Sequence, residues 1–425
     1  MGLLVLKFGG TSVATIPAIE NVADKVVGET RLGHKVAVIV SAMSGVTNQL
    51  VEYCTAISQI FDPREYDAIV SSGEQVTSGL LALALQKRGI AARSWQGWQI
   101  PILTSEAHGK ARIRGIDAQV LQDAMNKGEV AVIAGFQGAT ASGRITTLGR
   151  GGSDTSAVAV AAALKADRCD IYTDVDGVYT ADPRIVTHAR KIKRISYEEM
   201  LEMASVGAKV LQTRSVELAM KERVPLQVLS SFEKALGSDL PGTMVEDEEN
   251  IVEQEVVSGV THSRDEAKVT LRSLPDVPGV AAKIFGPLAD SSINVDMIVQ
   301  NLSPDKKSTD LTFTVPRADL PKTVDVLKSV CKELQGVQME SSADVAKISI
   351  VGIGMRSYVG VASKMFKTLA EKGINIQVIT TSEIKVSVLI AEEYTELAVR
   401  ALHTAYGLDK DQEEKPASAK SGKVA

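Results

Sequence analysis

The sequence predicts an α/β protein with a largely parallel central sheet in its first part and two ferredoxin-like units in its last part. In the first part, short apolar runs alternate with segments of helical spacing, which is typical of parallel strands joined by helices. Aromatic residues make up only 4% of the chain, so the core must consist mainly of aliphatic side chains, as in buried parallel sheets. The third observation is an internal repeat near the C-terminus.

The first part opens with a buried apolar strand that ends at two glycines. The residues after it carry apolar side chains at helical spacing, and a loop of small residues, 41–45, ends the second strand. Strands are expected at residues 3–8, 36–40, 130–134 and 170–173, and helices at 16–29, after residue 45, and at 74–88 and 157–164. This alternation predicts an α/β domain with a largely parallel sheet.

The composition excludes several classes of protein. The formal net charge is −5, from 47 basic and 52 acidic residues, which gives no indication of nucleic-acid binding. The three cysteines, Cys54, Cys169 and Cys331, are far apart in the sequence, which favours reduced thiols. The histidines form no cluster, so we expect no metal site held by side chains. The first apolar run is too short for a signal peptide, and no stretch reaches the ~20 apolar residues of a membrane span. We therefore expect a cytoplasmic protein.

Two related units follow an acidic segment, 246–255, which is either a linker or an exposed helical turn. An offset of 81 residues places Gly279 on Gly360 and Ile298 on Ile379 without a gap. Each unit reads as strand, helix, strand, strand, the beginning of a ferredoxin-like βαββαβ arrangement. The expected divisions are a first domain at 1–245, a linker and first strand at 246–265, repeat units at 266–345 and 346–412, and a disordered tail at 413–425.

The segment from Lys7 to Ser12 (KFGGTS) follows the first strand. Glycines let backbone N–H groups approach phosphate oxygens, and the next helix directs the positive end of its dipole to the same place. Lys7 would then neutralise the charge of a phosphoryl group in transfer. The segment is not a P-loop, and a simple strand-to-helix turn is an equal alternative.

A glycine-rich run from Thr147 to Thr155 (TLGRGGSDT) precedes an expected helix. One arginine, a flexible backbone and the polar pair Ser153 and Asp154 at the helix start suit an anionic ligand. The alternative is a flexible loop with a helix cap. The position of the run inside an α/β domain favours the functional interpretation.

The segment from Thr173 to Arg184 (TDVDGVYTADPR) follows another expected strand. A loop at a strand end that carries Tyr, Asp and Arg suits a nucleotide, and Pro183 would stiffen it. Its resemblance to an EF-hand is superficial, because the acidic first position and the late glutamate are missing.

Glu74, in the segment SSGEQ, lies at the start of an expected helix. Its position alone favours a capping role. The functional alternative is that its carboxylate receives a substrate ammonium group.

Together these motifs resemble the amino-acid kinase family, and within it the single-function aspartate kinases. KFGGTSV at Lys7–Val13 is a highly specific opening for that group, and SSGEQ, TLGRGGSDTSA and YTDVDGVYTADPR follow in the same order and spacing. The two C-terminal units resemble ACT domains, which bind small amino acids at their interfaces. The resemblance covers nearly the whole chain and implies a three-layer sandwich followed by two ACT units.

The resemblance implies that the γ-phosphate of ATP, carried with Mg²⁺, is transferred to the β-carboxylate of L-aspartate in the first step of lysine, threonine and methionine biosynthesis. Glu74 would hold the aspartate amino group and Arg150 its α-carboxylate. The catalytic residues would be Lys7, Arg150 and Asp154, and the other substrate contacts Ser41, Thr47, Gly151, Gly152, Ser153 and Asp154. The nucleotide contacts would be Lys7, Phe8, Gly9, Gly10, Thr173, Asp174, Tyr179, Asp182 and Arg184.

The charges of the reactants define the mechanism. A carboxylate nucleophile is ionised at pH 7, so no general base is required. The barrier comes from bringing this anion to an anionic triphosphate, and the protein must screen the repulsion and align the groups. Lys7, backbone N–H groups and the Mg²⁺ that ATP carries would do so, without metal ligands from side chains.

In the ACT units the resemblance implies inhibition by lysine, threonine or both. The expected effector contacts are Asp276, Pro278, Gly279, Val280, Asn294, Val295, Asp296, Gln300, Asn375, Ile376 and Thr380. ACT pairing between chains implies a homo-oligomer, and some relatives add a shorter subunit, which here would begin near Met244.

Two other functions are alternatives. Other amino-acid kinases act on glutamate, acetylglutamate or nucleoside monophosphates, but they lack this opening together with ACT units. Glu74 with Arg150 suits a free amino acid instead. A non-catalytic amino-acid sensor is disfavoured by the intact Lys7, Arg150 and Asp154, and the length and the missing dinucleotide fingerprint exclude a kinase–dehydrogenase.

Overall fold

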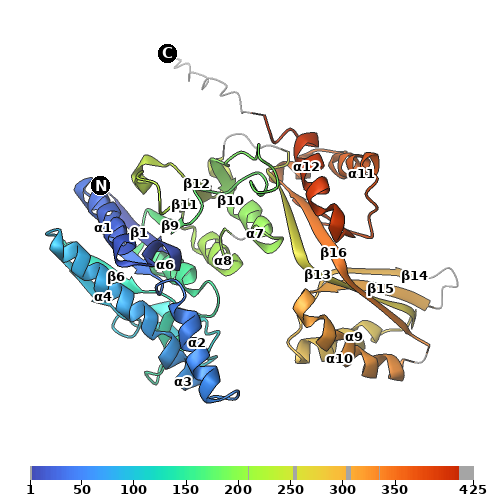
Figure 1. Cartoon of the computed structure of the whole chain (residues 1–425), viewed down its shortest axis with the longest axis horizontal. Coiled ribbons are helices and arrows are strands. Elements are labelled where there is room, and N and C mark those ends of the chain that lie inside the picture. Colours follow the sequence, from blue (N-terminus) through green and yellow to red (C-terminus); the bar gives the residue numbers. More distant parts are fainter. Residues whose placement is uncertain (1, 209, 252–255, 303–307, 335, 411–425) are drawn as a thin grey trace, which may run out of the picture.

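The chain folds into two domains, which lie side by side in the computed structural model (Figure 1). The structure describes residues 2–208, 210–251, 256–302, 308–334 and 336–410. The expected tail, 413–425, and the loop 303–307 therefore lie outside the described residues. The N-terminal domain carries a central sheet, and the C-terminal domain contains the two repeat units.

The central sheet has eight strands in the order β10-β12-β11-β9-β1-β2-β6-β3, and every neighbouring pair is parallel except β11 with β12. The expectation of a mostly parallel sheet is confirmed. The strands are β1 (Leu3–Phe8), β2 (Lys35–Val40), β3 (Ala92–Trp95), β6 (Val130–Ala134), β9 (Arg168–Thr173), β10 (Arg194–Ser196), β11 (Leu226–Ser230) and β12 (Thr243–Glu246).

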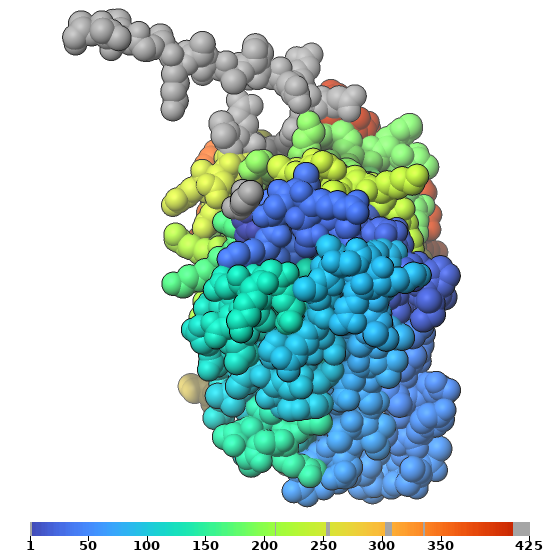
Figure 2. Space-filling view, turned by 90° about the vertical axis from the view of Figure 1, so that its left-hand side faces the viewer, coloured from blue at the N-terminus to red at the C-terminus, as the bar shows by residue number. Residues whose placement is uncertain are grey.

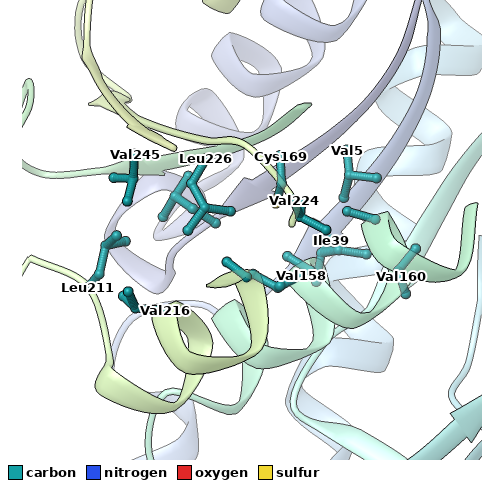
Figure 3. Close-up of a cluster of buried hydrophobic side chains, with 14 of the residues drawn as sticks. Val5, Ile39, Val158, Val160, Cys169, Leu211, Val216, Val224, Leu226 and Val245 are labelled. Carbon is teal, nitrogen blue, oxygen red and sulfur yellow. The ribbon is translucent and has the colours of Figure 1, made fainter. Parts of the chain in front are cut away.

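Helices cover both faces of this sheet, because successive strand residues point to opposite sides. Val5 and Ile39 pack on one face against α6, as Figure 3 shows, whereas Leu4 and Leu6 pack on the other face. The first face is covered by α5 (Gln119–Asn126), α6 (Gly152–Leu164), α7 (Tyr197–Ser205) and α8 (Thr213–Glu222), and the second by α1 (Ile16–Arg31) and α4 (Ser72–Lys87). The three-layer sandwich is thus confirmed, and its core is mainly aliphatic.

A smaller four-stranded sheet, in the order β5-β4-β7-β8, borders the carboxyl edge of the central sheet. Its strands are β4 (Ile102–Thr104), β5 (Ile113–Ile116), β7 (Gln137–Ala139) and β8 (Ile145–Thr147), and the helices α2 (Val46–Ile57) and α3 (Pro63–Val70) lie nearby. Figure 2 faces the outer side of this domain, where the N-terminal third, coloured blue to teal, forms most of the surface. β8 leads directly into the glycine-rich run, so this small sheet fixes where the run begins.

The helical segment formed by α3 and α4 is long and apolar enough to cross a membrane by length and composition alone. Half of its most apolar window is buried inside the protein. A core helix of a soluble protein passes the same test, so this segment is weak evidence for a membrane span.

The C-terminal domain has one antiparallel six-stranded sheet in the order β14-β15-β13-β16-β18-β17. Its strands are β13 (Gly259–Pro275), β14 (Asp296–Leu302), β15 (Ser308–Val315), β16 (Gln338–Val351), β17 (Val378–Thr381) and β18 (Lys385–Ala391). The helices are α9 (Val280–Asp290), α10 (Leu320–Glu333), α11 (Val361–Glu371) and α12 (Thr395–Ala405).

The two long strands β13 and β16 belong to both repeat units. The start of β13, Gly259–Ser263, pairs with Lys347–Val351 beside the second unit, whereas Lys268–Arg272 pairs with Gln338–Ser342 in the first. The boundaries expected at residues 266 and 346 therefore fall inside continuous strands. This sharing joins the units into one sheet, and β13 and β16 cross the domain diagonally in Figure 1.

The contact between the domains leaves no room for a side chain at Gly207. Its φ is +123°, and a Cβ atom there would lie 2.0 Å from the backbone oxygen of His262 in β13.

We expect Gly207→Ala to lower the free energy of unfolding by roughly 2 kcal/mol or more. The matched control is Gly79→Ala in α4, where a Cβ meets nothing within 4 Å. That change should stabilise the protein by up to ~1 kcal/mol. Urea unfolding of both variants tests this, and equal stabilities would contradict the close approach.

Candidate active site

The predicted site residues lie where the carboxyl ends of parallel strands meet the start of a helix, the usual place for ligands in such sheets. Lys7, near the end of β1, forms an ion pair with Asp154 in the first turn of α6, with 2.6 Å between Nζ and Oδ1. Both residues are 8% exposed. The structure thus brings together two residues, far apart in sequence, that were expected to be catalytic.

The two glycines after β1 allow close backbone packing. A Cβ on Gly10 would lie 3.0 Å from the backbone oxygen of Ala42, and a Cβ on Gly9 would lie 3.4 Å from Nζ of Lys7. A larger residue at Gly9 would therefore crowd the ammonium group that the site presents. The segment KFGGTS leads into a short 3₁₀ helix and then α1, as a phosphate-binding turn requires.

Ser231 is a site residue that the sequence analysis missed. It follows β11, and its hydroxyl is hydrogen-bonded to that of Ser12 at 2.5 Å. Asn21 also donates to the Ser231 backbone oxygen at 3.0 Å. The turn after β11 is therefore attached to the turn after β1. The sequence signal was only a polar pair at a strand end, Ser230 and Ser231.

Glu74 is a buried carboxylate with only part of its hydrogen-bonding capacity used. Its Oε1 accepts a hydrogen bond from the backbone N–H of Ala42 at 3.1 Å, and its Oε2 has no hydrogen-bond partner among the described residues. Glu74 is 3% exposed, and burial raises its pKa to about 7. A buried carboxylate without a cation suits an incoming ammonium group. The capping role that spacing favoured does not account for this burial.

The glycine-rich run forms the N-terminus of α6. Gly151 has a φ of +71° and packs against Gln212, and a Cβ on Gly152 would lie 2.7 Å from the ring of Phe136. Ser153 is buried beside Gly135. This packing holds the helix start, whose dipole favours anions, next to the Lys7–Asp154 pair.

Three expected substrate contacts are more exposed than the buried Lys7–Asp154 pair. Arg150 is exposed and makes no hydrogen bond or ion pair with any described residue. Ser41 is half-buried directly after β2, and its backbone N–H donates to the Phe8 oxygen at 3.1 Å. Thr47 is half-buried in the first turn of α2. The guanidinium of Arg150 is thus available to a ligand.

The expected nucleotide segment begins where β9 ends. Thr173 donates to Asp174 at 3.1 Å, and Asp176 accepts hydrogen bonds from the Tyr179 hydroxyl at 2.9 Å and from Lys191 Nζ at 3.0 Å. Burial and the bond to Asp176 raise the pKa of Tyr179 to about 12. Lys191 was not predicted, and its contact with Asp176 places a cation beside this segment.

Asp182 and Arg184 pair with each other at the outer end of the same segment. The guanidinium of Arg184 lies 2.7 Å from Oδ2 of Asp182, and hydrogen bonds from Arg184 lower the pKa of that carboxyl group. The Arg184 side chain is 89% exposed. The structure therefore shows this pair at the protein surface, engaged with itself.

The segment between these two groups packs into the C-terminal domain. Thr180 is buried; its hydroxyl is hydrogen-bonded to Nε2 of His403 in α12 at 2.9 Å, and its backbone oxygen accepts from Val260 at 2.8 Å. Ala181 and Val186 belong to the hydrophobic core of the second repeat unit. The predicted nucleotide segment is thus partly built on the second unit.

Glu199 forms a second connection between the domains. It is buried in α7, and its Oε1 accepts from the Ser258 hydroxyl at 2.5 Å and from the Ile353 N–H at 3.0 Å. Lys385 of β18 adds an ion pair to Glu202 at 2.7 Å. Polar as well as apolar contacts therefore fix the second unit on the first domain.

The expected effector contacts divide between a pocket and its surroundings. A pocket of about 210 Å³ in the first unit is lined by Leu274, Pro275, Asp276, Val277, Gly279, Val280, Ala281, Gln300, Thr309 and Leu311. Asp276, Gly279, Val280 and Gln300 had been expected there. The other expected contacts that do not line it are Pro278, Asn294, Val295, Asp296, Asn375, Ile376 and Thr380.

Asp296 takes part in an ion cluster with Lys347, whose Nζ lies 2.7 Å from Asp296 and 2.7 Å from Glu266. Lys347 is 4% exposed, and desolvation opposes its charge while the two carboxylates raise its pKa. Within the described parts of the chain, no group of three or more His, Cys, Asp or Glu side chains is placed to hold a metal ion.

Comparisons with known proteins identify the family. Residues 2–230 match the amino acid kinase family, and residues 272–330 and 348–406 each match an ACT domain. The chain is 56% identical to an aspartate kinase of Stutzerimonas stutzeri, over 96% of this chain and 98% of that one. It is 55% identical to an aspartokinase of Pseudomonas aeruginosa, with the same coverage. Among solved structures, E. coli aspartokinase III in complex with aspartate and ADP superposes with a TM-score of 0.77 at 28% identity, over 95% of this chain and 99% of that one.

The mostly parallel eight-stranded sheet, with helices on both faces, has the fold of the amino acid kinase family. The chain belongs to the amino acid kinase family, and within that family to the aspartate kinases.

The raised pKa of Glu74 generates a pH prediction. Below about pH 7 the free enzyme keeps a proton on Glu74, which cannot then pair with an ammonium group. We expect kcat/KM for the amino-acid substrate to rise with pH to a plateau above about 7. The pKa of Glu74 is about 7 in the folded protein and 4.5 ordinarily, so the folded state binds the proton more tightly. The free energy of unfolding should therefore fall as the pH rises from about 4.5 to about 7.

Glu74→Gln should lower kcat/KM by about a hundredfold and flatten its pH profile, because a neutral amide neither titrates nor pairs with an ammonium. The exposed Glu106→Gln is the matched control and should keep the wild-type profile. A Glu74→Gln enzyme with an unchanged profile would assign the titration to another group.

Proposed function

We propose that this aspartate kinase transfers the γ-phosphate of ATP, bound with Mg²⁺, to the β-carboxylate of L-aspartate, and that lysine, threonine or both inhibit it through the ACT domains. The observation that carries the proposal is the buried Lys7–Asp154 pair at the start of α6. A buried, unpaired carboxylate at Glu74 supports an amino acid as the acceptor.

The reaction requires alignment and charge screening and no general base. A β-carboxylate oxygen attacks the γ-phosphorus, the bond from that phosphorus to the bridging oxygen of ADP breaks, and ADP leaves with the electron pair. Asp154 holds Lys7 in place before nucleotide binds. When the phosphates arrive, Lys7 offsets the charge that spreads over the transferring group. Glu74 and Arg150 would hold the two α-substituents of aspartate and so orient its β-carboxylate.

Mg²⁺ would be held mainly by the phosphates. It takes oxygen ligands and usually keeps several waters when it is bound with a nucleotide. Asp154 is already engaged by Lys7, and no multi-carboxylate cage occurs in the described residues. The ion would neutralise part of the triphosphate charge, and the donor set here fits an ion that arrives with ATP.

Regulation by an amino acid is supported by the pocket in the first ACT unit. Asp276 and Gln300 supply a carboxylate and an amide among apolar walls, which suits a small zwitterion. E. coli aspartokinase III in complex with lysine and aspartate also superposes on this chain, with a TM-score of 0.74. The buried contacts of Thr180 provide the route from the ACT sheet to the nucleotide segment.

The proposal includes a cytoplasmic homo-oligomer formed through the ACT domains. The edge strands β14 and β17 expose Ile298 and Ile379, which are equivalent in the repeat and are 51% and 43% exposed. Analytical ultracentrifugation of the purified protein measures the size of this assembly.

A shorter subunit that begins near Met244 would start inside β12 and keep both ACT units. Intact-mass analysis of the purified protein would detect it.

Acyl phosphate formation, trapped with hydroxylamine, tests the central proposal. Product that depends on ATP, Mg²⁺ and L-aspartate, and that lysine or threonine suppresses, supports the reaction and its regulation. Glutamate and acetylglutamate serve as alternative acceptors. Absence of product from aspartate with a correctly folded enzyme would overturn the assignment.

Lys7→Ala should reduce turnover by at least about a hundredfold, because it removes the cation that faces the phosphoryl group. It also leaves Asp154 buried without its partner, so we expect a lower melting temperature as well. Lys35→Ala removes an exposed lysine from the neighbouring strand and should change neither property strongly. Comparable hydroxamate rates in the Lys7 and Lys35 variants would refute the catalytic role.

Thr180→Val tests the route from the ACT domain. It removes the hydroxyl that His403 contacts, which also accepts from the Arg190 N–H at 3.0 Å, and it keeps the side-chain shape. We expect the KM for ATP to rise about threefold or more, and the inhibitor concentration for half-inhibition to rise similarly. Thr187→Val, exposed in the same segment, is the control. If both variants keep the wild-type ATP response and the wild-type inhibition, the nucleotide segment does not depend on this contact.

A further inference from the structure

A fully buried carboxylate, Asp67, lies outside the predicted site. It belongs to α3 and is 0% exposed. Its oxygens accept hydrogen bonds from Nδ1 of His108 at 2.7 Å, from the N–H of Gly109 at 3.0 and 3.1 Å, and from the Thr147 hydroxyl at 2.6 Å. These donors satisfy the buried carboxylate, so Asp67 is suited to hold other segments in place.

The partners of Asp67 lie on two neighbouring loops, one of which carries Arg150. Thr147 is the last residue of β8, three positions before Arg150. The Gly109 backbone oxygen would lie 3.2 Å from a Cβ on Gly149, so the two loops are in close contact. Arg214 also donates to the backbone oxygens of Leu148 and Ala111, at 2.7 and 2.8 Å, one on each loop. Asp67 and Arg214 therefore fasten the same pair of loops from two directions.

At its other end, Asp67 belongs to the helical segment that carries Glu74. Its backbone oxygen accepts from the N–H of Ser71 at 3.1 Å, and the Ser71 oxygen accepts from the Gln137 side chain at 3.0 Å. Glu74 follows in the first turn of α4. A Cβ on Gly73 would come within 2.6 Å of the Ala42 side chain, so this segment cannot shift freely.

We propose that Asp67 is a positioning residue for aspartate, because it fixes the loop of Arg150 relative to the helix of Glu74. The inference rests on the proposed function, in which these two residues take the α-carboxylate and the α-ammonium. Those groups share one carbon atom, so a small relative shift of their protein partners weakens binding of the amino acid. The expected nucleotide contacts follow other strands, so their positions should not change when the loop of Arg150 moves.

Asp67→Asn tests the inference by separating the two substrates. The amide keeps the size of the side chain but cannot accept from all of these donors. We expect the KM for L-aspartate to rise about tenfold, while the KM for ATP changes less than about twofold. Asp62→Asn, at the exposed N-cap of the same helix, is the control and should leave both KM values unchanged. Equal effects on both substrates, or none, would overturn the proposal.

Thr147 supplies a second test if Asp67→Asn folds poorly. Thr147→Val removes one donor to Asp67, whereas Thr147→Ser keeps the hydroxyl. The valine variant should show the same selective rise in the KM for aspartate, and the serine variant should restore a nearly normal value. Equal KM values in both would refute the proposal. If the wild type is active with L-aspartate and the variants show no selective rise in its KM, only this inference fails. If the wild type forms no product from L-aspartate, the proposed function fails.

Discussion

The ion pair between Lys7 and Asp154 is the contact around which the catalytic domain is arranged. A lysine that is 8% exposed at a strand end requires a nearby negative charge, because desolvation disfavours an isolated ammonium. Asp154 supplies that charge from the first turn of α6, where the helix dipole also favours an anion. The pair forms only if α6 packs tightly on β1, and the closely packed Gly152 and the aliphatic core beneath it make this approach possible. The position of this ion pair is thus a consequence of core packing.

The sequence predicted the strands and helices well because their information is local. Apolar runs such as residues 3–8 and 130–134 identify buried strands by themselves, and the repeat offset identifies the paired units. Motif residues at strand ends could be assigned to one edge because parallel strands bring their carboxyl ends together. Asp154, in contrast, reaches Lys7 from the first turn of α6, which follows β8 of the smaller sheet. The placement of Arg150 and Thr47 in contact with substrate stays a prediction.

Other features could not be predicted from local patterns. Glu74 has the spacing of a helix cap, and only the three-dimensional packing of α4 on the loop after β2 shows that its carboxylate is buried. The bond between Ser12 and Ser231 joins residues 219 apart, and the bonds of Asp67 reach 41 to 80 positions along the chain. Hydrogen bonds of this kind depend on the final arrangement of elements, which periodicity does not encode.

The shared strand β13 gives the two ACT units a direct connection to the catalytic domain. Its C-terminal residues Leu274 and Pro275 line the pocket of the first unit, and Val260 near its start donates to Thr180 in the nucleotide segment. A strand of 17 residues spans roughly 50 Å, so a single element joins two distant sites. Its pairing with β16 shifts register on either side of Glu266, where Lys347 holds it. Such bulges allow a strand to bend. A second register shift, against β15, lies between Leu271 and Leu274. The strand therefore runs without a break from the pocket of the first ACT unit, past these irregularities, to its contact with Thr180 in the expected nucleotide segment.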